Sequence, residues 1–482
     1  MNFNELLNLV SSDNARNICV DSRTVTDGDI FVAVKGTACD GHDFIDQALD
    51  KGAEYIVCQT APDRYTQNDT DVIVVDDSIE AAALLAQTIR GNPASQLTNL
   101  AVTGTNGKTT VAYMVRSCIR QAGQKCGLLG TVIYDTCSEN PSEAVLTTPD
   151  CLTIAAGQEQ MLKNGAKYMV IEASSHALSQ NRLAGISFKA AAFTNLAGDH
   201  LDYHKTEEDY LAAKTILFSA LSPDAVAVLN KQSPHAPSIA KQTKAKILWY
   251  SIDTQADITA HIESMDTGGT VFNMVCAGQS AIVKTPLLGL YNVSNCLAAA
   301  GLCLAAGFDL ENIAAGLSAL KTIPGRLEKI DFPCDFSVLV DYAHTDDALK
   351  NVLSTLKPLC KGKLIAVFGC GGDRDKTKRP RMARVAEQLA DFIIVTSDNP
   401  RTESSEEIIK DIIPGFENPD SQTILIEPDR KKAIASSIKT ACKNDIVLIA
   451  GKGHETYQII GKQKFDFSDK KIAMEYLTTK RK

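Results

Sequence analysis

The segment 99–111 restricts the fold of this chain more than any other part of the sequence. It reads Asn-Leu-Ala-Val-Thr-Gly-Thr-Asn-Gly-Lys-Thr-Thr-Val, and apolar residues continue at helical spacing through 114, 115 and 118. An apolar run, a glycine-rich loop and a helical pattern in this order predict a β-strand, a phosphate-binding loop and an α-helix. Gly104 and Gly107 let backbone N–H groups turn toward an anion, and Lys108 adds a positive charge.

The loop departs from the common phosphate-loop spelling, Gly-x4-Gly-Lys-Ser/Thr. Val102 stands five residues before Gly107, and the additional glycine is Gly104. An ordinary glycine turn is the alternative, but a Lys-Thr-Thr sequence directly after an apolar strand favours phosphate binding. The hydroxyl of Thr109 is a suitable ligand for Mg²⁺. We therefore predict a nucleotide site formed by Gly104, Thr105, Asn106, Gly107, Lys108, Thr109 and Thr110.

The bulk composition excludes several classes of protein. With 482 residues the chain is long enough for about three domains, and its formal net charge of −9 argues against a broad surface for nucleic acid or anionic membranes. The first residues lack the pattern of a signal peptide, and the longest apolar tract, 293–308, is too short to span a bilayer. The fourteen cysteines form no Cys-x-x-Cys pair and no zinc spacing with histidine. We expect a cytoplasmic protein with reduced thiols and no nucleic-acid or membrane partner.

Alternating strand and helix patterns divide the chain into three α/β domains. Residues 1–95 form a small unit, whose strands are expected at 30–34, 56–58 and 72–75. Residues 96–325 show the alternation of a doubly wound, mostly parallel sheet, with later strands at 167–171 and 190–194. The turn Ile323-Pro-Gly-Arg326 marks the second boundary. Residues 326–482 form another open α/β sheet, with strands expected at 338–342, 364–368, 392–396, 424–426 and 446–450.

Two strands of the central domain end in polar segments, and ligands of parallel sheets gather at such strand ends. Glu172 follows the strand at 167–171, and His200 lies within the segment 194–204, which follows the next strand. Glu172 is a candidate ligand for the Mg²⁺ of a nucleotide. A helix cap is the alternative interpretation of a single glutamate at this position.

Lys214 lies on the apolar face of the helix expected at 210–218. Tyr210, Ala213, Leu217 and Phe218 fall on the same stripe. Burial lowers the pKa of a lysine and favours the neutral amine, which can add CO₂ to give a carbamate, an anionic ligand for a divalent ion. The alternative is a lysine that extends its ammonium group to the solvent.

Four charged segments follow strands of the C-terminal domain. They are Asp341-Tyr-Ala-His344, Gly369-Cys-Gly-Gly-Asp-Arg374-Asp-Lys376, Asp398-Asn-Pro-Arg401 and Gly451-Lys-Gly-His-Glu455. Because each segment follows a strand of one parallel sheet, we expect them to meet at one edge and form a shared site.

These segments, taken in order, resemble the motifs of the Mur ligase family. The similarity includes Thr103-Gly-Thr-Asn-Gly-Lys-Thr-Thr110, Asp199-His-Leu-Asp-Tyr-His204, the Ala-Lys214 helix, Pro324-Gly-Arg326 and the segments 341–344 and 451–455, and it extends over nearly all of the chain. The resemblance implies an N-terminal domain for the UDP end of a substrate, a central ATPase and a C-terminal domain for an amino acid. It also implies that ATP phosphorylates the free D-glutamate carboxylate of UDP-N-acetylmuramoyl-L-alanyl-D-glutamate. The amine of an amino acid then attacks the acyl phosphate to form an amide.

The resemblance also implies roles for individual residues, in a protein that we expect to be a monomer. Lys108, His200 and Lys214 would be catalytic. Thr109 and Glu172 would bind one Mg²⁺, while His200 and a carbamylated Lys214 would bind a second. Beyond the phosphate loop, ATP would contact Asn292, Arg326 and Asp341. The UDP-linked substrate would contact Val20, Ser22, Thr147, Thr148, Ser174, Gln180 and Arg182.

The amino acid implied by the resemblance is meso-diaminopimelate. Its contacts would be Arg374, Asp398, Asn399, Pro400, Arg401, Gly451 and Glu455. Family members that add this amino acid typically carry Asp-Asn-Pro-Arg, which is the sequence of residues 398–401. Diaminopimelate has one more carboxylate than lysine, and Arg401 can bind it with two parallel hydrogen bonds while Glu455 meets the distal ammonium group. L-Lysine is the nearest alternative.

Two further functions remain as alternatives. Folylpolyglutamate synthase shares the loop and the sheet, but the segments 398–401 and Asp21-Ser-Arg23 have no role there. A nucleotide-gated regulator would hydrolyse ATP without the UDP-dipeptide, whereas a ligase would release ADP only when the dipeptide and an amino acid are both present.

Overall fold

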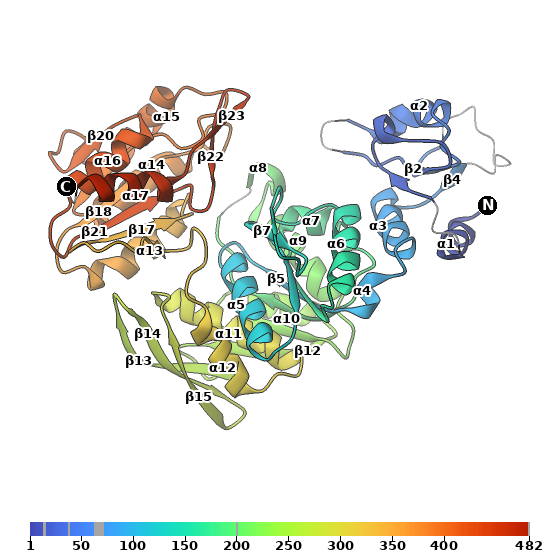
Figure 1. Ribbon diagram of the computed structural model, residues 1–482, viewed down its shortest axis with the longest axis horizontal. Helices are drawn as coiled ribbons and strands as arrows, with labels where there is room; N and C mark the ends of the chain where they lie inside the picture. The colour runs from blue at the N-terminus through green and yellow to red at the C-terminus, as the bar shows by residue number, and fades with distance from the viewer. Residues whose placement is uncertain (13–15, 37–38, 62–71, 199–200, 481–482) are drawn as a thin grey trace.

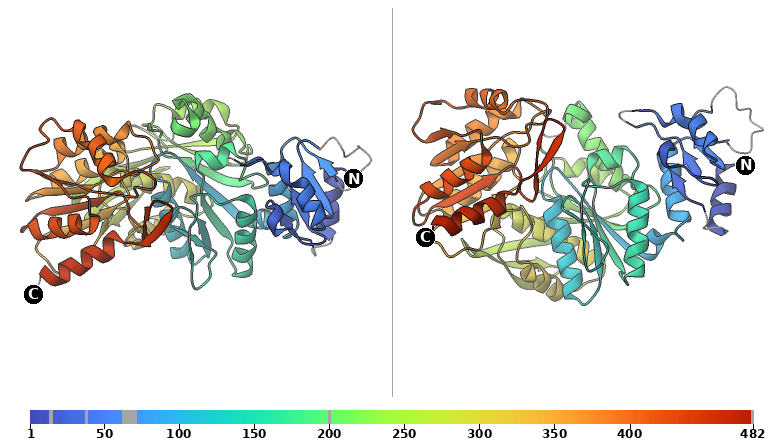
Figure 2. Two further views of the ribbon diagram at one scale, coloured as in Figure 1. Left: turned by 90° about the horizontal axis from the view of Figure 1, so that it is seen from above. Right: turned by 45° about the horizontal axis from the view of Figure 1, so that its top comes forward.

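Three α/β domains follow one another along the chain. The computed structural model describes residues 1–12, 16–36, 39–61, 72–198 and 201–480. The N-terminal domain, in blue, lies at one end of the molecule and the C-terminal domain, in orange and red, at the other, with the central domain between them (Figure 1). The two further views keep the same order (Figure 2).

The N-terminal domain is a four-stranded parallel sheet with helices on both faces. The strands are β1 (Ile18–Cys19), β2 (Ile30–Val32), β3 (Tyr55–Cys58) and β4 (Val72–Val74), in that order. The helices are α1 (Phe3–Ser12), α2 (Ile45–Asp50) and α3 (Ser78–Thr88), and 3₁₀ turns span Ser22–Thr24 and Gly41–Phe44. Successive residues of β2 face opposite sides of the sheet. Val32 packs with Leu6 and Ala82 on one side, and Phe31 packs with Ile45 on the other.

The central domain is built on an eleven-stranded sheet whose middle is parallel. The parallel strands, in spatial order, are β13 (Ile258–Asp266), β12 (Lys246–Ser251), β11 (Val226–Asn230), β10 (Phe188–Phe193), β5 (Thr98–Thr103), β9 (Tyr168–Glu172) and β6 (Cys126–Leu129). Antiparallel strands extend both ends, with β14 (Gly269–Cys276) and β15 (Gln279–Thr285) beyond β13, and β7 (Ile133–Asp135) and β8 (Ser142–Glu143) beyond β6.

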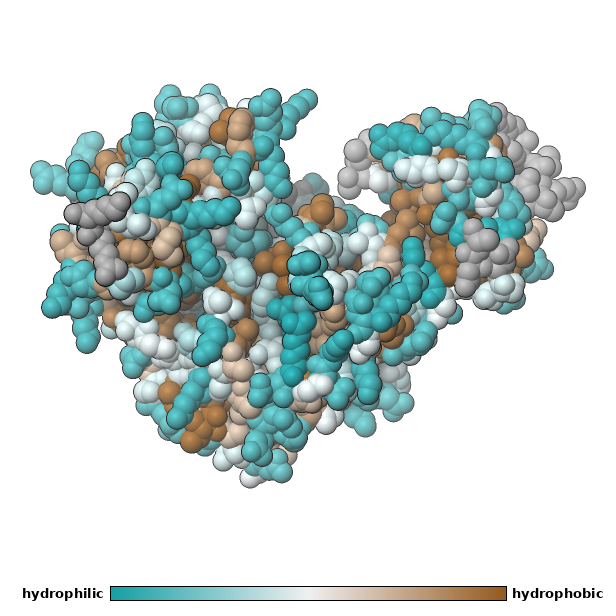
Figure 3. Space-filling view, viewed as in Figure 1, coloured by the Kyte–Doolittle hydropathy of each residue, from teal (hydrophilic) through white to brown (hydrophobic). Residues whose placement is uncertain are grey.

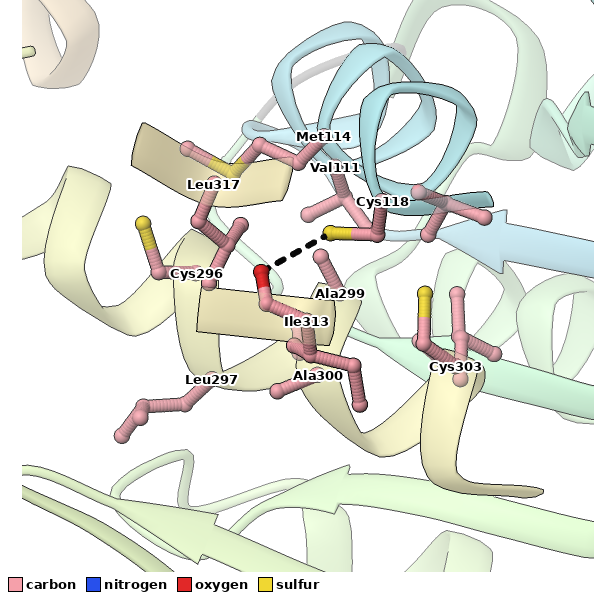
Figure 4. Close-up of a cluster of buried hydrophobic side chains, with 14 of the residues drawn as sticks. Val111, Met114, Cys118, Cys296, Leu297, Ala299, Ala300, Cys303, Ile313 and Leu317 are labelled. Carbon is pink, nitrogen blue, oxygen red and sulfur yellow. Dashed lines mark hydrogen bonds between the residues drawn. The ribbon is translucent and has the colours of Figure 1, made fainter. Parts of the chain in front are cut away.

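Helices cover both faces of this sheet. They are α4 (Pro93–Gln96), α5 (Lys108–Gln121), α6 (Cys151–Lys163), α7 (Ser175–Ser179), α8 (Leu201–His204), α9 (Glu207–Ser219), α10 (Ala236–Gln242), α11 (Leu290–Ala305) and α12 (Leu310–Ala319). The helix α5 packs against α11 and α12, and its Val111, Met114 and Cys118 face the other two helices (Figure 4). The thiol of Cys118 donates a hydrogen bond to the Ile313 carbonyl over 3.4 Å (Figure 4). This core fixes the helix that starts at the phosphate loop.

The C-terminal domain is a six-stranded sheet that is parallel except at one edge. Its order is β16 (Glu328–Lys329), β17 (Ser337–Asp341), β21 (Ile446–Ala450), β18 (Leu364–Phe368), β19 (Phe392–Val395) and β20 (Ile424–Ile426), and only β16 is antiparallel to its neighbour. Its helices are α13 (Asp346–Leu356), α14 (Lys378–Leu389), α15 (Ser405–Ile412), α16 (Arg430–Thr440) and α17 (Asp469–Lys480). Short 3₁₀ turns span Lys357–Leu359 and Ile413–Gly415, and a separate hairpin consists of β22 (Tyr457–Ile460) and β23 (Gln463–Asp466).

The structure confirms the fold class and most of the expected strands. The strand, loop and helix expected at 99–111 are β5, the loop 104–107 and α5. Every strand expected in the C-terminal domain lies within one residue of its observed bounds. The meander β13, β14 and β15 was not expected from the sequence. All fourteen cysteines are free, and no helix in the described part of the chain is long and apolar enough to cross a bilayer.

Candidate active site

The phosphate loop has the backbone that the sequence predicts. Gly107, which caps α5, has a φ of 90°, a left-handed conformation that L side chains rarely adopt. A Cβ atom at Gly104 would lie 1.9 Å from Thr194 Oγ1, so residue 104 has no room for a side chain. Lys108 Nζ donates to the carbonyls of Gly104 and Thr105 over 2.8 and 3.0 Å. The ammonium group is therefore folded back on its own loop.

A carboxylate lies behind the loop at the end of β9. Glu172 is fully buried and accepts hydrogen bonds from Thr109 Oγ1 at 2.9 Å, from the Thr131 N–H at 2.9 Å and from Thr131 Oγ1 at 2.8 Å. The helix-cap interpretation is wrong, because Ser174 caps the following helix α7. Glu172 and Thr109 offer the hard oxygen ligands that suit Mg²⁺. No group of three His, Cys, Asp or Glu side chains among the described residues is arranged to hold a metal ion.

Lys214 is buried, as the helical stripe predicts. It is 1% exposed, so the alternative of a solvated ammonium group is wrong. Its Nζ lies 4.3 Å from the centre of the Tyr210 ring, and the Tyr210 hydroxyl shares a hydrogen bond with Thr105 Oγ1 over 3.2 Å. Tyr210 thereby joins Lys214 to the phosphate loop. His200 lies outside the described residues, so its place beside Lys108 and Lys214 stays a prediction.

A cavity of about 360 Å³ opens between the phosphate loop and the C-terminal domain. Its lining includes all three residues expected to contact ATP beyond the loop, namely Asn292, Arg326 and Asp341, and also Asn106, Gly107 and Thr110 of the loop region. Arg326 Nη2 donates to Thr109 Oγ1 over 3.2 Å, and its guanidinium lies 4.9 Å from the centre of the Tyr342 ring. The C-terminal domain therefore contributes the Arg326 cation to this cavity, and the central domain contributes the phosphate loop.

The Asp341 carboxylate belongs to the same cavity. It accepts hydrogen bonds from the Leu327 and Ala343 N–H groups over 2.6 and 2.8 Å. Burial raises the pKa of Asp341, while the nearby Arg326 charge opposes that rise. Two backbone donors thus fix the carboxylate at the end of β17.

A second cavity, of about 870 Å³, lies between the N-terminal and central domains. Of the residues expected to contact the UDP-linked substrate, Val20, Ser22, Gln180 and Arg182 line it. Arg182 donates to Gln180 Oε1 and, over 3.0 Å, to the Thr148 carbonyl.

The other three residues expected to contact this substrate connect the second cavity to Glu172. Thr148 Oγ1 donates to the Glu172 carbonyl over 2.7 Å and lies 3.0 Å from Ser174 Oγ. Thr147 Oγ1 lies within hydrogen-bond distance of Thr131 Oγ1, at 3.1 Å. Thr147, Thr148 and Ser174 therefore lie beside the candidate metal ligand, between the second cavity and the phosphate loop.

The charged loops of the C-terminal domain meet at one sheet edge, as the sequence predicts. Glu455 Oε2 accepts hydrogen bonds from Asn399 Nδ2 at 2.9 Å and from the fully buried Lys452 Nζ at 2.8 Å. Asp398 lies 3.9 Å from the same ammonium group, and a Cβ atom at Gly451 would lie 2.5 Å from Asp398 Oδ2. Buried carboxylates are stable only when paired, so Lys452 holds this part of the site together.

Two arginines border this cluster. Arg401 Nη1 donates to the Gly372 carbonyl over 2.8 Å, and Arg374 Nη1 donates to the Asp373 carbonyl over 3.0 Å. Pro400 lies between Asn399 and Arg401, and its carbonyl accepts a hydrogen bond from the Glu403 N–H. The two guanidinium groups therefore belong to neighbouring loops, one after β18 and one after β19.

His454 lies on the seam between the central and C-terminal domains. Its ring lies 5.2 Å from the Tyr342 ring and hydrogen-bonds the Thr131 backbone. Its Nδ1 is buried and has no hydrogen-bond partner among the residues that the structure describes. Burial, and after it the Arg326 charge, lowers the pKa of His454 to about 4. Since Glu455 follows directly, this histidine joins the amino-acid loop to the residues that hold Glu172.

Sequence reasoning missed several residues that build the site. Thr131 gives Glu172 two hydrogen bonds, and the glycine before it at the end of β6 is the sequence signal that could have identified it. Asn195 accepts from the Asn106 N–H over 2.9 Å. Asn106 Nδ2 donates across the domains to Asp347 over 3.1 Å, a pairing that no local pattern could indicate.

The fold and the site define a three-domain protein in which the phosphate-loop domain borders one cavity toward the C-terminal domain and another toward the N-terminal domain. Three family models match the chain: "Mur ligase family, catalytic domain" over residues 14–90, "Mur ligase middle domain" over 102–303 and "Mur ligase, glutamate ligase domain" over 325–453. A protein of Bacillus licheniformis is 44% identical over 460 residues, which cover 94% of this chain and 93% of the relative. It is named UDP-N-acetylmuramoyl-L-alanyl-D-glutamate--2,6-diaminopimelate ligase. The chain therefore belongs to the Mur ligase family and is a ligase.

Solved structures agree with this membership. A structure of a UDP-N-acetylmuramoyl-L-alanyl-D-glutamate--2,6-diaminopimelate ligase has a TM-score of 0.69 and 35% identity, and the match covers 97% of this chain and 95% of that one. Folylpolyglutamate synthase of Mycobacterium tuberculosis, complexed with ADP and AMPPCP, has a TM-score of 0.62 and 20% identity over 76% of this chain and 91% of that chain. The second likeness concerns the fold alone.

Proposed function

We propose that this protein joins meso-diaminopimelate to the D-glutamate of UDP-N-acetylmuramoyl-L-alanyl-D-glutamate, with conversion of ATP to ADP and phosphate. This reaction is a step in the synthesis of peptidoglycan precursors. The names of the relatives support the activity. The observation that carries the choice of amino acid is Arg401, which follows Asn399 of the Asn399–Glu455 pair by two residues and donates to the Gly372 carbonyl at the C-terminal sheet edge. It would bind the carboxylate that distinguishes diaminopimelate from lysine.

Each domain contributes one substrate site in this proposal. The UDP end would occupy the cavity of about 870 Å³, so that the peptide end passes Thr148 and Ser174 toward Glu172. ATP would occupy the cavity of about 360 Å³, with its phosphates on the loop 104–110. The amino acid would lie among Arg374, Arg401 and Glu455.

The chemistry has two steps. A carboxylate oxygen of D-glutamate attacks the γ-phosphorus of ATP, and ADP leaves with the electrons of the broken P–O bond. The diaminopimelate amine, after loss of a proton, then attacks the acyl carbon, and phosphate leaves as the amide forms. Lys108 and Arg326 stabilise the negative charge on the transferred group, because both cations border the phosphate loop.

Thr109 and Glu172 would hold one Mg²⁺, which supplies charge neutralisation of the β- and γ-phosphates when bound. For a second ion we propose His200 and a carbamylated Lys214. The burial of Lys214 supports this assignment, since a neutral amine is the form that adds CO₂.

A panel of amino acids tests the function. We expect ADP release with the UDP-dipeptide and meso-diaminopimelate, and almost none when either is omitted. Equal turnover with L-lysine would assign the lysine-adding activity instead. ADP release without the UDP-dipeptide would favour a nucleotide-gated regulator, and turnover of a folate substrate would favour the folylpolyglutamate synthase activity.

A further inference from the structure

Gly371 lies beside both arginines of the amino-acid site. A Cβ atom built on Gly371 would lie 2.9 Å from Arg401 Nη1 and 3.9 Å from Arg374 Cγ. Ordinary contacts of a Cβ atom are longer than about 3.4 Å, so the guanidinium of Arg401 occupies space that any side chain at 371 would need. The hydrogen bond from Arg401 Nη1 to the Gly372 carbonyl, at 2.8 Å, depends on this space.

The backbone does not require glycine at this position. The φ of Gly371 lies outside the left-handed region, in contrast to the neighbouring Asp373, whose φ is 54°. Cβ atoms at Gly369 and Gly372 would lie 2.3 and 1.9 Å from the Thr396 and Pro400 carbonyl oxygens, so close backbone packing explains those two glycines. At Gly371 the nearest atom is instead the end of a flexible side chain.

The backbone of Arg401 is fixed independently of its side chain. Its N–H donates to the Ile459 carbonyl over 3.1 Å, and its carbonyl accepts from the Gly461 N–H over 2.7 Å. These bonds attach residue 401 to the hairpin of β22 and β23. An added methyl group at 371 would therefore move the guanidinium while the Cα of residue 401 stays in place.

We propose that Gly371 is a specificity-determining residue, whose missing side chain leaves the space in which Arg401 meets the distal carboxylate of the amino acid. The inference rests on the proposed function and deepens it. It assigns the choice of a dicarboxylic amino acid to a pair, one arginine and one glycine, instead of to the arginine alone.

A double-mutant cycle with Gly371→Ala and Arg401→Ala tests the pair. In the full-length enzyme, ADP release would give kcat and KM for meso-diaminopimelate, L-lysine and ATP. We expect Gly371→Ala to raise the KM for meso-diaminopimelate about tenfold, as expected when one hydrogen bond to a charged group is lost. The KM for ATP should not change, nor should any turnover that the unmodified enzyme shows with L-lysine. The double variant should match Arg401→Ala, because glycine acts only through that guanidinium.

Gly157→Ala is the matched control. Gly157 lies in α6, away from the amino-acid site, and its Cβ atom would meet only ordinary contacts, the nearest at 3.7 Å. An unchanged KM for meso-diaminopimelate in Gly371→Ala, or additive effects in the double variant, would overturn the proposal. A large fall in the melting temperature of Gly371→Ala would also contradict it, since only a flexible side chain is expected to move. If the unmodified enzyme does not use meso-diaminopimelate, the proposed function itself fails, and that result is visible before any variant is made.

Discussion

At the scale of single residues, Lys214 is a buried lysine on the apolar face of its helix. A lysine that is 1% exposed and lies over a tyrosine ring has lost most of its contact with water. A buried ammonium group is stable only when it is paired, and a carbamate at this position would instead offer anionic oxygens to a metal ion. Tyr210 connects this lysine to the phosphate loop, through one hydrogen bond to Thr105.

We expect Lys214→Ala to lower kcat by roughly a hundredfold or more, because the carbamate proposed on Lys214, an anionic ligand near the transferred phosphoryl group, would be lost. Propionate with bicarbonate should restore part of the activity. Lys163→Ala, which removes an exposed lysine from another helix, is the control and should be fully active. A carbamate carbon signal from ¹³C-bicarbonate in the unmodified enzyme would support the assignment. A fully active enzyme without that signal would refute it.

A second residue-scale prediction concerns His454 and pH. Its pKa is lowered to about 4 in the folded protein, by burial and then by Arg326, and is about 6.5 in an unfolded chain. As the pH falls, the histidine of the unfolded state therefore takes up its proton first. The stability that the buried, neutral histidine contributes is fully present above pH 6.5 and is lost as the pH falls toward 4. One pKa unit corresponds to about 1.4 kcal/mol, and the two pKa values differ by about 2.5, so the loss is at most about 3.5 kcal/mol.

Unfolding of the unmodified protein and of His454→Gln at pH 7 and pH 4.5 measures this effect. We expect the stability difference between the two proteins to move in favour of the variant at the lower pH. The same difference at both pH values would contradict the buried, neutral histidine.

At the scale of elements, the contact between α5 and α12 sets the direction of the helix after the phosphate loop. A Cβ atom at Gly316 would lie 2.3 Å from the Cα of Cys118, which is backbone and cannot move aside. We expect Gly316→Ala to destabilise the central domain by about 1–3 kcal/mol, the usual cost of overpacking. Thermal unfolding checks this, with Gly157→Ala as a helical control that should be neutral or slightly more stable. An unchanged melting temperature in Gly316→Ala would mean that the helices separate freely.

The elements that could be predicted from the sequence are those with strong local patterns. The buried parallel strands β18 and β21 read as continuous apolar runs, which parallel sheets require because both faces are covered. The meander β13 to β15 was missed because its strands alternate buried and exposed positions, with charged residues on one face. Such short alternations are weaker signals than a glycine loop or a long apolar run.

Part of the candidate site could also be predicted from strong local patterns. Thr109, Glu172 and Arg401 lie in short motifs that follow a predicted strand, and this position marks them as candidates. Thr131 and Asp347 act through partners far away in the chain, and only the folded structure shows those pairings. The hydrogen bonds that Glu455 accepts from Asn399 and Lys452 could not be predicted from the sequence either.

At the scale of the whole molecule, the two cavities lie on opposite sides of one phosphate loop. Hydrophilic side chains cover most of the visible face, and a hollow separates the N-terminal and C-terminal domains above the central one (Figure 3). Contacts such as Arg326–Thr109 and Asn106–Asp347 join the central and C-terminal domains across the nucleotide cavity. We infer that substrates from three domains meet at the terminal phosphate of ATP.

Transfer of an oxygen label tests this convergence most directly. The D-glutamate side-chain carboxylate of the UDP-dipeptide would be labelled with ¹⁸O, and the phosphate released during ligation would be analysed by mass spectrometry. We expect each phosphate to carry one labelled oxygen, because the carboxylate attacks the γ-phosphorus and that oxygen leaves with it. Phosphate without the label would show that ATP is cleaved by water and would contradict the activation of the carboxylate.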